Sequence, residues 1–325
     1  MELIFCDLDI NLQMYSVPTE FRRNLSDKFR DCKFFYESES QIINNNDVTV
    51  YWGNRLPNDF LDIYPNLKWI HFGSVGIDRY IKVKNNEKQN ILVTNSNNSV
   101  TSGMYSHTMF QIFYLLRQGF LIEKMRRSNS LSRENFDQNF FKILNINDLK
   151  VLIVGFGNIG KKIGNDLMQM GADVKGIASK EKITKTGINI YTVDRLAELV
   201  KDRNLVISLL PYKPSLEGLF KQKVFNNMPK NSYFINNGRA SHVIEKDLIN
   251  ALNNNLAGAA IDVYAHNMKT NCLSILNQEN LLITPHIGAV DPSYWLRQKN
   301  LFEYNLKCFL DNKKEKMKNI CNSNF

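Results

Sequence analysis

The clearest chemical motif in the sequence is a glycine-rich run, GFGNIG, at positions 155–160. It follows the apolar segment LKVLIV and precedes Ile163 and Leu167, which recur at helical spacing. In a strand–turn–helix, the first glycine allows a tight turn, the second admits a pyrophosphate against the backbone, and the third lets helix and strand approach. The helix N-terminus stabilises the anion. We therefore predict a dinucleotide site formed by Gly155, Phe156, Gly157, Asn158, Ile159 and Gly160.

A second chemical signal lies at the end of the following apolar segment, VKGIA. An NAD-specific site normally has Asp or Glu there, about 20 residues after the glycines, to bind the adenosine ribose. This sequence has Ala178, Ser179 and Lys180 instead. A hydroxyl and an ammonium bind a 2′-phosphate, which a carboxylate would repel. The sequence therefore favours NADP(H), with Ser179 and Lys180 as ligands; a solvated Ser-Lys turn that binds NAD(H) is the alternative.

The elements that must position these residues form two α/β units. Apolar runs such as LIFCDL, VTVYWG and LKWIHFG alternate with amphipathic stretches, which predicts a parallel sheet in the first part of the chain. Residues from Met104 to Leu116 recur at helical spacing and predict a long helix that joins the units. The glycine motif opens the second unit, whose later strands are LVISLLP, SYFINNG, AGAAIDVY and NLLITPH. After Asp291 and Pro292, an expected N-cap and first-turn pair, a last helix is predicted to return to the first unit. We expect a substrate domain of residues 1–98 and 289–325 and an inserted NAD(P)-binding domain of residues 99–288.

Composition excludes several classes of protein. A length of 325 residues favours two domains, and 43% hydrophobic with 22% charged residues is typical of globular proteins rather than disordered or membrane proteins. No apolar run approaches about 18 residues, and the first residues lack a signal-peptide pattern, so we expect a cytoplasmic protein with no membrane partner. The net charge of +9 is scattered, so no nucleic-acid partner is expected. The cysteines include no CxxC pair, and no metal site is predicted.

Five ordered blocks of the chain resemble the D-isomer-specific 2-hydroxyacid dehydrogenase family, and most closely its glyoxylate and hydroxypyruvate reductases. The blocks are LKWIHFGSVGIDRY, GFGNIG, SLLPYKPSLEGLF, FINNGRASHVIEKDLINALNNNLAGAAIDVY and ITPHIGAV. The resemblance implies an α/β fold of two domains, flavodoxin-like for the substrate and Rossmann-like for the cofactor. It also implies a cleft site and usually a homodimer.

The resemblance assigns the reaction to two residues. Arg239, in NNGRA, matches the family arginine that pairs with the substrate carboxylate and polarises the 2-oxo group, a task that suits a planar bidentate donor. His286, in TPHIG, matches the general acid that protonates the carbonyl oxygen. Backbone N–H groups of the first-domain loop are expected to receive the carboxylate, at Ser74, Val75 and Gly76.

The resemblance also places residues around the cofactor. Asp262, in IDVY, corresponds to the aspartate that hydrogen-bonds the nicotinamide carboxamide. Asn236, Asn237 and Gly238 are expected at the same end of the cofactor, while Leu210 and Pro211 line the adenosine side.

One position departs from the family pattern. Five residues after Asp262 the family has a glutamate that orients the histidine and raises its pKa, whereas this chain has Asn267. An amide oxygen can hold the imidazole tautomer but adds no charge to stabilise imidazolium. Three interpretations follow: a slower reductase with an acid-shifted optimum, an enzyme that recruits Glu279 or another carboxylate, or a catalytically silent protein. Ser106, where the family commonly has an acidic residue, is a second departure.

The function expected from the sequence is NAD(P)H-dependent reduction of a small 2-oxoacid to a D-2-hydroxyacid. Arg239 would bind the carboxylate, His286 would act as the acid, and Asn267 would support it. The alternative is a catalytically weak or silent NAD(P)-sensing protein on the same scaffold. Retention of both Arg239 and His286 favours the enzyme.

Overall fold

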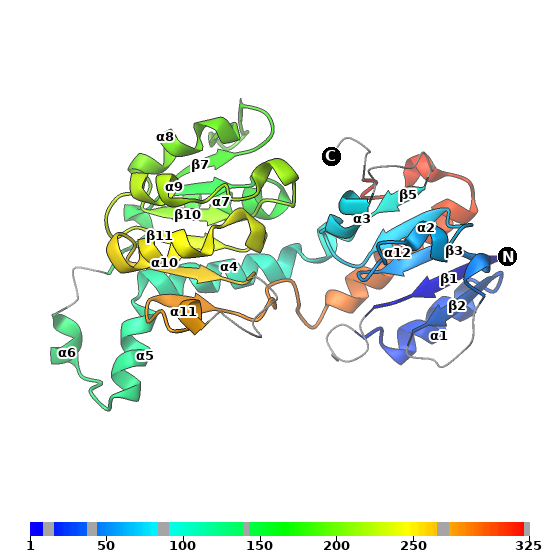
Figure 1. The fold of residues 1–325 in the computed structure, drawn as a ribbon, viewed down its shortest axis with the longest axis horizontal. Helices are drawn as coiled ribbons and strands as arrows, with labels where there is room; N and C mark the ends of the chain where they lie inside the picture. Colours follow the sequence, from blue (N-terminus) through cyan, green and yellow to red (C-terminus); the bar gives the residue numbers. More distant parts are fainter. Residues whose placement is uncertain (9–15, 38–43, 84–90, 139–142, 265–272, 322–325) are drawn as a thin grey trace. The chain divides into compact units, whose positions relative to one another are not determined.

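A computed structural model describes residues 1–8, 16–37, 44–83, 91–138, 143–264 and 273–321. The chain forms two compact units, one of Met1–Val100 with Val290–Phe325 and one of Thr101–Ala289 (Figure 1). The second unit is therefore inserted in the sequence of the first. Both are α/β units built on parallel sheets, which confirms the fold class expected from the sequence.

The first unit has a sheet in the order β2-β1-β3-β4-β5, and the paired strands run parallel. This is the flavodoxin-like strand order. The strands are β1 (Glu2–Cys6), β2 (Cys32–Tyr36), β3 (Val48–Gly53), β4 (Trp69–Phe72) and β5 (Leu92–Thr94). The helices are α1 (Thr19–Lys28), α2 (Phe60–Ile63), α3 (Asp78–Val83) and, from the end of the chain, α12 (Tyr294–Leu310).

Helix α12 belongs to the first unit because its apolar face packs on that sheet. The Phe302 ring stacks on Trp52 with centroids 4.0 Å apart and on Trp69 at 5.4 Å. The helix begins later than the sequence suggested. Its N-cap is Ser293, whereas the Asp291 carboxylate accepts the Ser293 N–H and pairs with Arg297. The predicted cap at Asp291 was wrong because Asp291 instead forms a turn that precedes the helix.

The second unit has a sheet in the order β13-β12-β11-β10-β6-β7-β9-β8, parallel except for β8. Its strands are β6 (Lys150–Val154), β7 (Asp173–Ile177), β8 (Lys182–Ile183), β9 (Asn189–Tyr191), β10 (Leu205–Ser208), β11 (Tyr233–Asn236), β12 (Gly258–Ile261) and β13 (Leu281–Ile283). The chain runs outward from β6 through β7 to β9 and returns to β10 on the other side of β6. The carboxyl ends of β6 and β10 are thus the topological switch point, where open α/β sheets bind their ligands.

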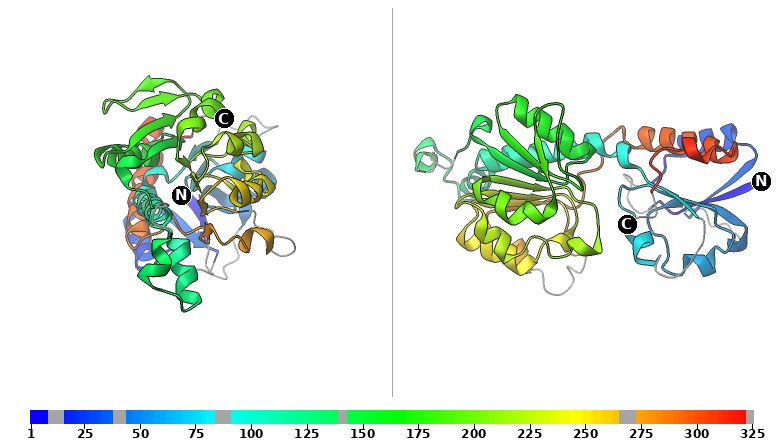
Figure 2. Two further views of the ribbon diagram at one scale, coloured as in Figure 1. Left: turned by 90° about the vertical axis from the view of Figure 1, so that its left-hand side faces the viewer. Right: turned by 90° about the horizontal axis from the view of Figure 1, so that it is seen from above.

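Helices lie on both faces of this second sheet (Figure 2). Alternate strand residues enter two separate cores: Val154 and Phe234 pack on one face, and Ile153 and Ile235 on the other. Burial on both faces explains why these strands read as continuous apolar runs. The helices are α4 (Thr101–Leu116), α5 (Gly119–Arg127), α6 (Arg133–Asp137), α7 (Asn158–Gln169), α8 (Leu196–Leu199), α9 (Gln222–Asn227), α10 (Glu245–Asn254) and α11 (Leu273–Leu276). Among the described residues, no helix is both long and apolar enough to span a membrane.

Candidate active site

The glycine motif forms the turn between β6 and α7, as predicted. Gly155 has a φ of 108°, and a Cβ there would lie 2.7 Å from the Leu209 carbonyl carbon. A Cβ on Gly160 would lie 2.5 Å from the Gly155 oxygen. Gly157 differs from both, because a Cβ there would meet no atom within 4 Å. Two glycines are therefore required by the protein's own packing, whereas Gly157 leaves open space at the N-terminus of α7.

The other motif residues contribute unequally. The Phe156 ring is buried and occupies the space beside Gly164 and Gly176, where added Cβ atoms would approach it to 2.8 and 2.5 Å. Ile159 packs against the same core. Both side chains are thus structural, so only their backbone can face a ligand. The N–H groups of Gly155 and Phe156 donate to the Ile177 oxygen at 3.0 and 2.8 Å, which leaves the first turn of α7 to offer amide donors.

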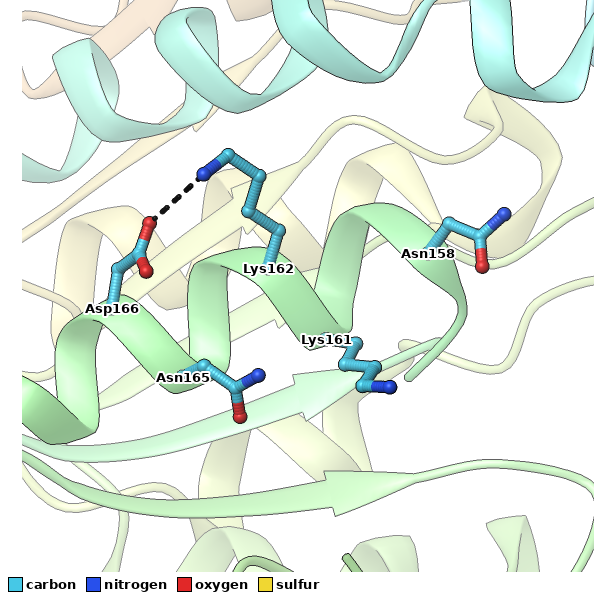
Figure 3. A pocket seen from close by; sticks show the side chains of 5 residues that line it. All are labelled: Asn158, Lys161, Lys162, Asn165 and Asp166. Atoms are coloured by element: carbon cyan, nitrogen blue, oxygen red, sulfur yellow. Dashed lines mark hydrogen bonds and ion pairs between the residues drawn. The ribbon is translucent and has the colours of Figure 1, made fainter. Parts of the chain in front are cut away.

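A pocket of about 360 Å³ lies along the exposed face of α7 (Figure 3). Its walls include only Asn158 of the glycine motif, together with Lys161, Lys162, Asn165 and Asp166. The Lys162 ammonium lies 3.3 Å from the Asp166 carboxylate and 4.2 Å from the Tyr105 ring centroid. Because this hollow follows the exposed side of α7 and its walls include neither Arg239 nor His286, we do not assign it as the active site.

The carboxyl ends of β6, β10 and β11 meet closely. A Cβ on Gly238 would lie 2.8 Å from the Leu210 oxygen and 3.0 Å from its nitrogen. Gly155 approaches the same segment, at Leu209 and Leu210 just after β10. Pro211 follows and is exposed. The structure therefore brings three predicted cofactor residues, Gly155, Leu210 and Gly238, to one edge of the sheet.

Ser179 and Lys180 lie just beyond the end of β7 and are both exposed. Within the described part of the chain, Lys180 forms no ion pair. The next acidic residue, Glu181, lies 3.4 Å from the Thr192 hydroxyl. The segment after β7 therefore presents a hydroxyl and a cation to solvent.

Arg239 follows β11 in a turn that is held by Asn236. The Asn236 side chain accepts the Gly238 N–H at 3.1 Å and donates to the Arg239 oxygen at 3.0 Å. The half-buried Arg239 guanidinium donates to the Gly238 oxygen at 2.8 Å. Asn237 points its amide nitrogen toward α4, 2.7 Å from Gln111 Oε1 and 2.9 Å from Thr108 Oγ1. The Asn237 Oδ1 is buried and has no partner among the described residues, so it is an acceptor that a ligand could use.

His286 lies in the turn after β13, is exposed, and has a φ of 57°. Asp262, at the end of the neighbouring β12, is 1% exposed and accepts from three donors of this turn. The Ile287 and Gly288 N–H groups donate at 3.0 and 2.9 Å, and the Thr284 hydroxyl at 2.6 Å. Since β11, β12 and β13 are adjacent, the strand order places Asp262 between the turns that carry Arg239 and His286.

Two polar residues of α4 join this cluster and were not assigned to the site from the sequence. His107 Nε2 lies 3.0 Å from Thr284 Oγ1 and 3.5 Å from Asp262 Oδ1, and the Gln111 amide nitrogen lies 3.1 Å from the same ring nitrogen. Burial lowers the pKa of His107, and the Asp262 charge opposes that shift. The sequence signal that could have identified them is their spacing of four residues on a mostly apolar helix, because polar side chains that share a buried face need hydrogen-bond partners.

The loop from Gly73 to Gly76 in the first unit is tied down through its carbonyls. The Ser96 N–H donates to the Ser74 oxygen at 3.0 Å, and the Asn95 side-chain amide donates to the Val75 oxygen at 2.8 Å. The Ser74 hydroxyl donates to the Gly76 oxygen at 2.9 Å. From α12, the Gln298 amide donates to the Gly73 oxygen at 2.6 Å. The backbone N–H groups of Ser74, Val75 and Gly76 have no acceptor among the described residues. The loop can therefore offer backbone donors to an anion.

Two expectations around His286 have different outcomes. Asn267 lies outside the described residues, so its side chain is not located. Glu279, considered as a substitute carboxylate, is exposed and pairs with Lys124 at 2.7 Å. Glu279 therefore forms a surface ion pair and does not contact His286. Among the described residues, no group of three His, Cys, Asp or Glu side chains could hold a metal ion.

The glycine turn at the switch point of a doubly wound parallel sheet defines a dinucleotide-binding α/β protein. A sequence profile for the NAD binding domain of the D-isomer specific 2-hydroxyacid dehydrogenases matches residues 110–288, more than half of the chain. The chain belongs to this family of NAD(P)-dependent dehydrogenases, which confirms the resemblance inferred from the sequence.

A relative agrees with this assignment, and a solved structure shares the fold. A putative 2-hydroxyacid dehydrogenase of Staphylococcus epidermidis is 30% identical over 71% of this chain and 72% of its own. A glyoxylate/hydroxypyruvate reductase A of Yersinia enterocolitica is also 30% identical, but the match spans 42% of this chain and only 44% of that enzyme. The fold resembles an NADPH-dependent glyoxylate/hydroxypyruvate reductase of Sinorhizobium meliloti in complex with NADP and sulfate, with a TM-score of 0.81, 20% identity, and 99% and 98% of the two chains covered.

Proposed function

We propose that the protein is a reductase that uses NAD(P)H to convert a small 2-oxoacid, of the glyoxylate or hydroxypyruvate kind, into a D-2-hydroxyacid. The observation that carries the proposal is the strand-end arrangement in the second unit. Arg239 and His286 follow β11 and β13, on either side of Asp262, in the same sheet whose switch point carries the glycine turn. A cation for a carboxylate, a proton donor and a dinucleotide turn at one sheet edge meet the requirements of 2-oxoacid reduction.

For the cofactor we propose NADP(H) as the preferred form, with NAD(H) as the alternative. The exposed Lys180 beyond β7 supports this preference, because its ammonium is available to a 2′-phosphate. The open space at Gly157 and the first turn of α7 would accept the pyrophosphate. The unpartnered Asn237 Oδ1 would accept a hydrogen bond from the nicotinamide end. When bound, the nicotinamide supplies the two-electron reducing equivalent for the carbonyl carbon.

For the substrate we propose Arg239 as the residue that binds the carboxylate, because its planar guanidinium can donate two hydrogen bonds and also polarise the 2-oxo group. In the first unit, taken by itself, the amides of Ser74, Val75 and Gly76 have no acceptor among the described residues, and we propose this loop as a backbone site for an anion. The Arg239→Lys substitution tests the first role through kcat/KM.

For proton transfer we propose His286 as the general acid. Its ring would donate a proton to the carbonyl oxygen as charge develops there. Asn267 would then accept the other imidazole N–H and fix the tautomer without adding charge. That lack of charge favours the second candidate function, an NAD(P)-sensing protein with little or no turnover.

A fluorescence titration with NADPH and NADH, followed by a reduction assay, separates the two functions. We expect tighter binding of NADPH, and oxidation of NADPH in the presence of glyoxylate, hydroxypyruvate or phenylpyruvate. Tight binding without oxidation by any of these acids would support the sensing protein instead. A catalytically inactive His286→Ala variant, which should still bind NADPH, provides the matched control for background oxidation.

We also propose that the protein forms a homodimer. Large apolar side chains on α4 and α5 are solvent-exposed in the single chain, including Phe110 at 50%, Phe113 at 42% and Ile122 at 41%. Exposed apolar side chains gathered on neighbouring helices are typical of protein contact surfaces. Light scattering coupled to size-exclusion chromatography should give twice the chain mass of 37.7 kDa. A monomer at micromolar concentration would contradict this proposal.

A further inference from the structure

The turn that carries His286 has an unusual backbone conformation. His286 adopts a φ of 57°, in the left-handed region that residues with a Cβ rarely occupy outside constrained sites. Within the turn, the His286 N–H donates to the Thr284 oxygen at 2.9 Å. A conformation of this kind persists only when its surroundings impose it. The donors on either side of His286 show what imposes it.

Asp262 supplies the constraint with both carboxylate oxygens. Oδ1 accepts from the Ile287 N–H at 3.0 Å and from the Thr284 hydroxyl at 2.6 Å, while Oδ2 accepts from the Gly288 N–H at 2.9 Å. Thr284 lies two residues before His286, whereas Ile287 and Gly288 lie one and two residues after it. Asp262 is 1% exposed and directly follows β12, so the sheet fixes its position. The carboxylate therefore spans the turn and fixes the peptide planes next to His286.

Helix α4 closes the turn from the other side. A Cβ on Gly288 would lie 2.9 Å from Asp262 Oδ2 and 3.0 Å from both the His107 ring and the Met104 sulfur. His107 Nε2 lies 3.0 Å from Thr284 Oγ1. Gly288 is thus clamped between Asp262 and α4, with no room for a side chain. The segment has one well-defined path.

We propose that Asp262 is a positioning residue that aims His286 by holding the backbone of residues 284–288. This inference deepens the proposed function, because it rests on the assignment of His286 as the acid. This role is compatible with the expected contact to the nicotinamide carboxamide, because Oδ2 accepts only the Gly288 N–H among the described residues and a carboxylate oxygen can accept two donors. A negative, buried acceptor suits this role, because hydrogen bonds to an ionised group are stronger than those to a neutral one.

The substitution Asp262→Asn tests the proposal. The amide keeps the size of the carboxylate but places an NH2 group against a backbone N–H, which breaks at least one bond to the turn. Hydrogen exchange of the Ile287 and Gly288 amides, measured without substrate, should accelerate by roughly tenfold, the factor that a lost hydrogen bond corresponds to. The turnover number should fall by about 100-fold, as for a misplaced catalytic group. The exposed Asp194→Asn change in the same unit is the matched control and should alter neither.

Cofactor binding separates positioning from carboxamide recognition. In Asp262→Asn, the dissociation constant of 2′-phospho-ADP-ribose, which lacks nicotinamide, should stay within about twofold of the wild type, and the fall in turnover number should persist at saturating NADPH. A turnover number that recovers at saturating NADPH would overturn the proposal, because loss of the carboxamide contact alone would then explain the defect, as would unchanged exchange at Ile287 and Gly288 in a folded variant.

Two further outcomes remain interpretable. If Asp262→Asn does not fold, Thr284→Val, which removes the hydroxyl that donates to Asp262 and contacts His107, should accelerate exchange in the turn to a smaller degree. No acceleration there would count against the proposal. If the wild type reduces no 2-oxoacid, the proposed function fails, while the exchange measurement still decides whether Asp262 holds the turn.

Discussion

Substituting alanine at two glycines of the same turn should have opposite consequences. At Gly160 the new Cβ would lie 2.5 Å from the Gly155 oxygen and 3.0 Å from the Ile153 side chain, so the backbone must move. Overpacking of this kind costs about 1 to 3 kcal/mol of folding free energy. For a unit of this size, the melting temperature of Gly160→Ala should fall by roughly 2 to 12 °C.

At Gly157 the same methyl group meets no protein atom within 4 Å, and the backbone φ of −82° is accessible to alanine. Loss of a favourable N-cap glycine costs some tenths of a kcal/mol, and the lower entropy of the unfolded chain offsets a similar amount. The melting temperature should therefore change by less than about 3 °C. The methyl group would nevertheless occupy the space through which a pyrophosphate approaches the backbone, so the NADPH dissociation constant should rise by about tenfold or more.

Thermal unfolding without ligand and fluorescence titration with NADPH measure the two effects on the same protein samples. The reasoning predicts that Gly157→Ala is stable and binds weakly, whereas Gly160→Ala is destabilised. If Gly157→Ala bound NADPH as tightly as the wild type, the open space at the start of α7 would not be the pyrophosphate site. If Gly160→Ala were as stable as the wild type, the turn would be looser than the structure indicates.

Three other perturbations follow from individual residues. Lys180→Ala should remove most of the preference for NADPH over NADH, about 1 to 3 kcal/mol for a charge-assisted contact, and equal dissociation constants in the wild type would refute the assignment. Asn267→Glu should raise the pKa of His286 and move the decline of the reduction rate to higher pH, with about a tenfold gain at neutral pH if the pKa rises by one unit; an indifferent pH profile would show that position 267 does not face the histidine. Burial lowers the pKa of His71 to about 3, below its usual value near 6.5, so protonation favours the unfolded state as the pH falls through that window. The free energy of unfolding of the first unit should therefore drop by about 2 kcal/mol between pH 7 and pH 5, and a slope that persists in a folded His71→Gln variant would assign the effect elsewhere.

The fold class and the family could be predicted from the sequence because their signals are local. The GFGNIG run lies between an apolar strand and an amphipathic helix, and each block of the family resemblance is contiguous in the chain. The structure confirms the parallel α/β architecture, with strand orders that no single segment could specify. The role of Phe156 could not be read in this way, because the space that its ring fills is created by Gly164 and by Gly176 on β7.

The support around His286 was the least predictable part of the site. It depends on contacts between α4, β12 and the turn after β13. Residues that touch there can be more than 100 positions apart in the sequence, as His107 and Thr284 are. Gln111 appeared in the sequence only as one position on a helical face, and its partner Asn237 lies far along the chain. Sequence spacing shows that buried polar residues need partners, but the tertiary fold selects them.

The most direct test of the central claim is the identity of the product formed from hydroxypyruvate and NADPH. Chiral chromatography of the reaction mixture, together with the absorbance of the remaining NADPH, measures the hydroxyacid enantiomer and the stoichiometry at once. The account predicts one D-2-hydroxyacid for each NADPH oxidised, with a marked loss of kcat/KM in Arg239→Lys, because a point charge cannot replace the planar guanidinium. An L or racemic product, or NADPH that is bound but never oxidised by a 2-oxoacid, would contradict it.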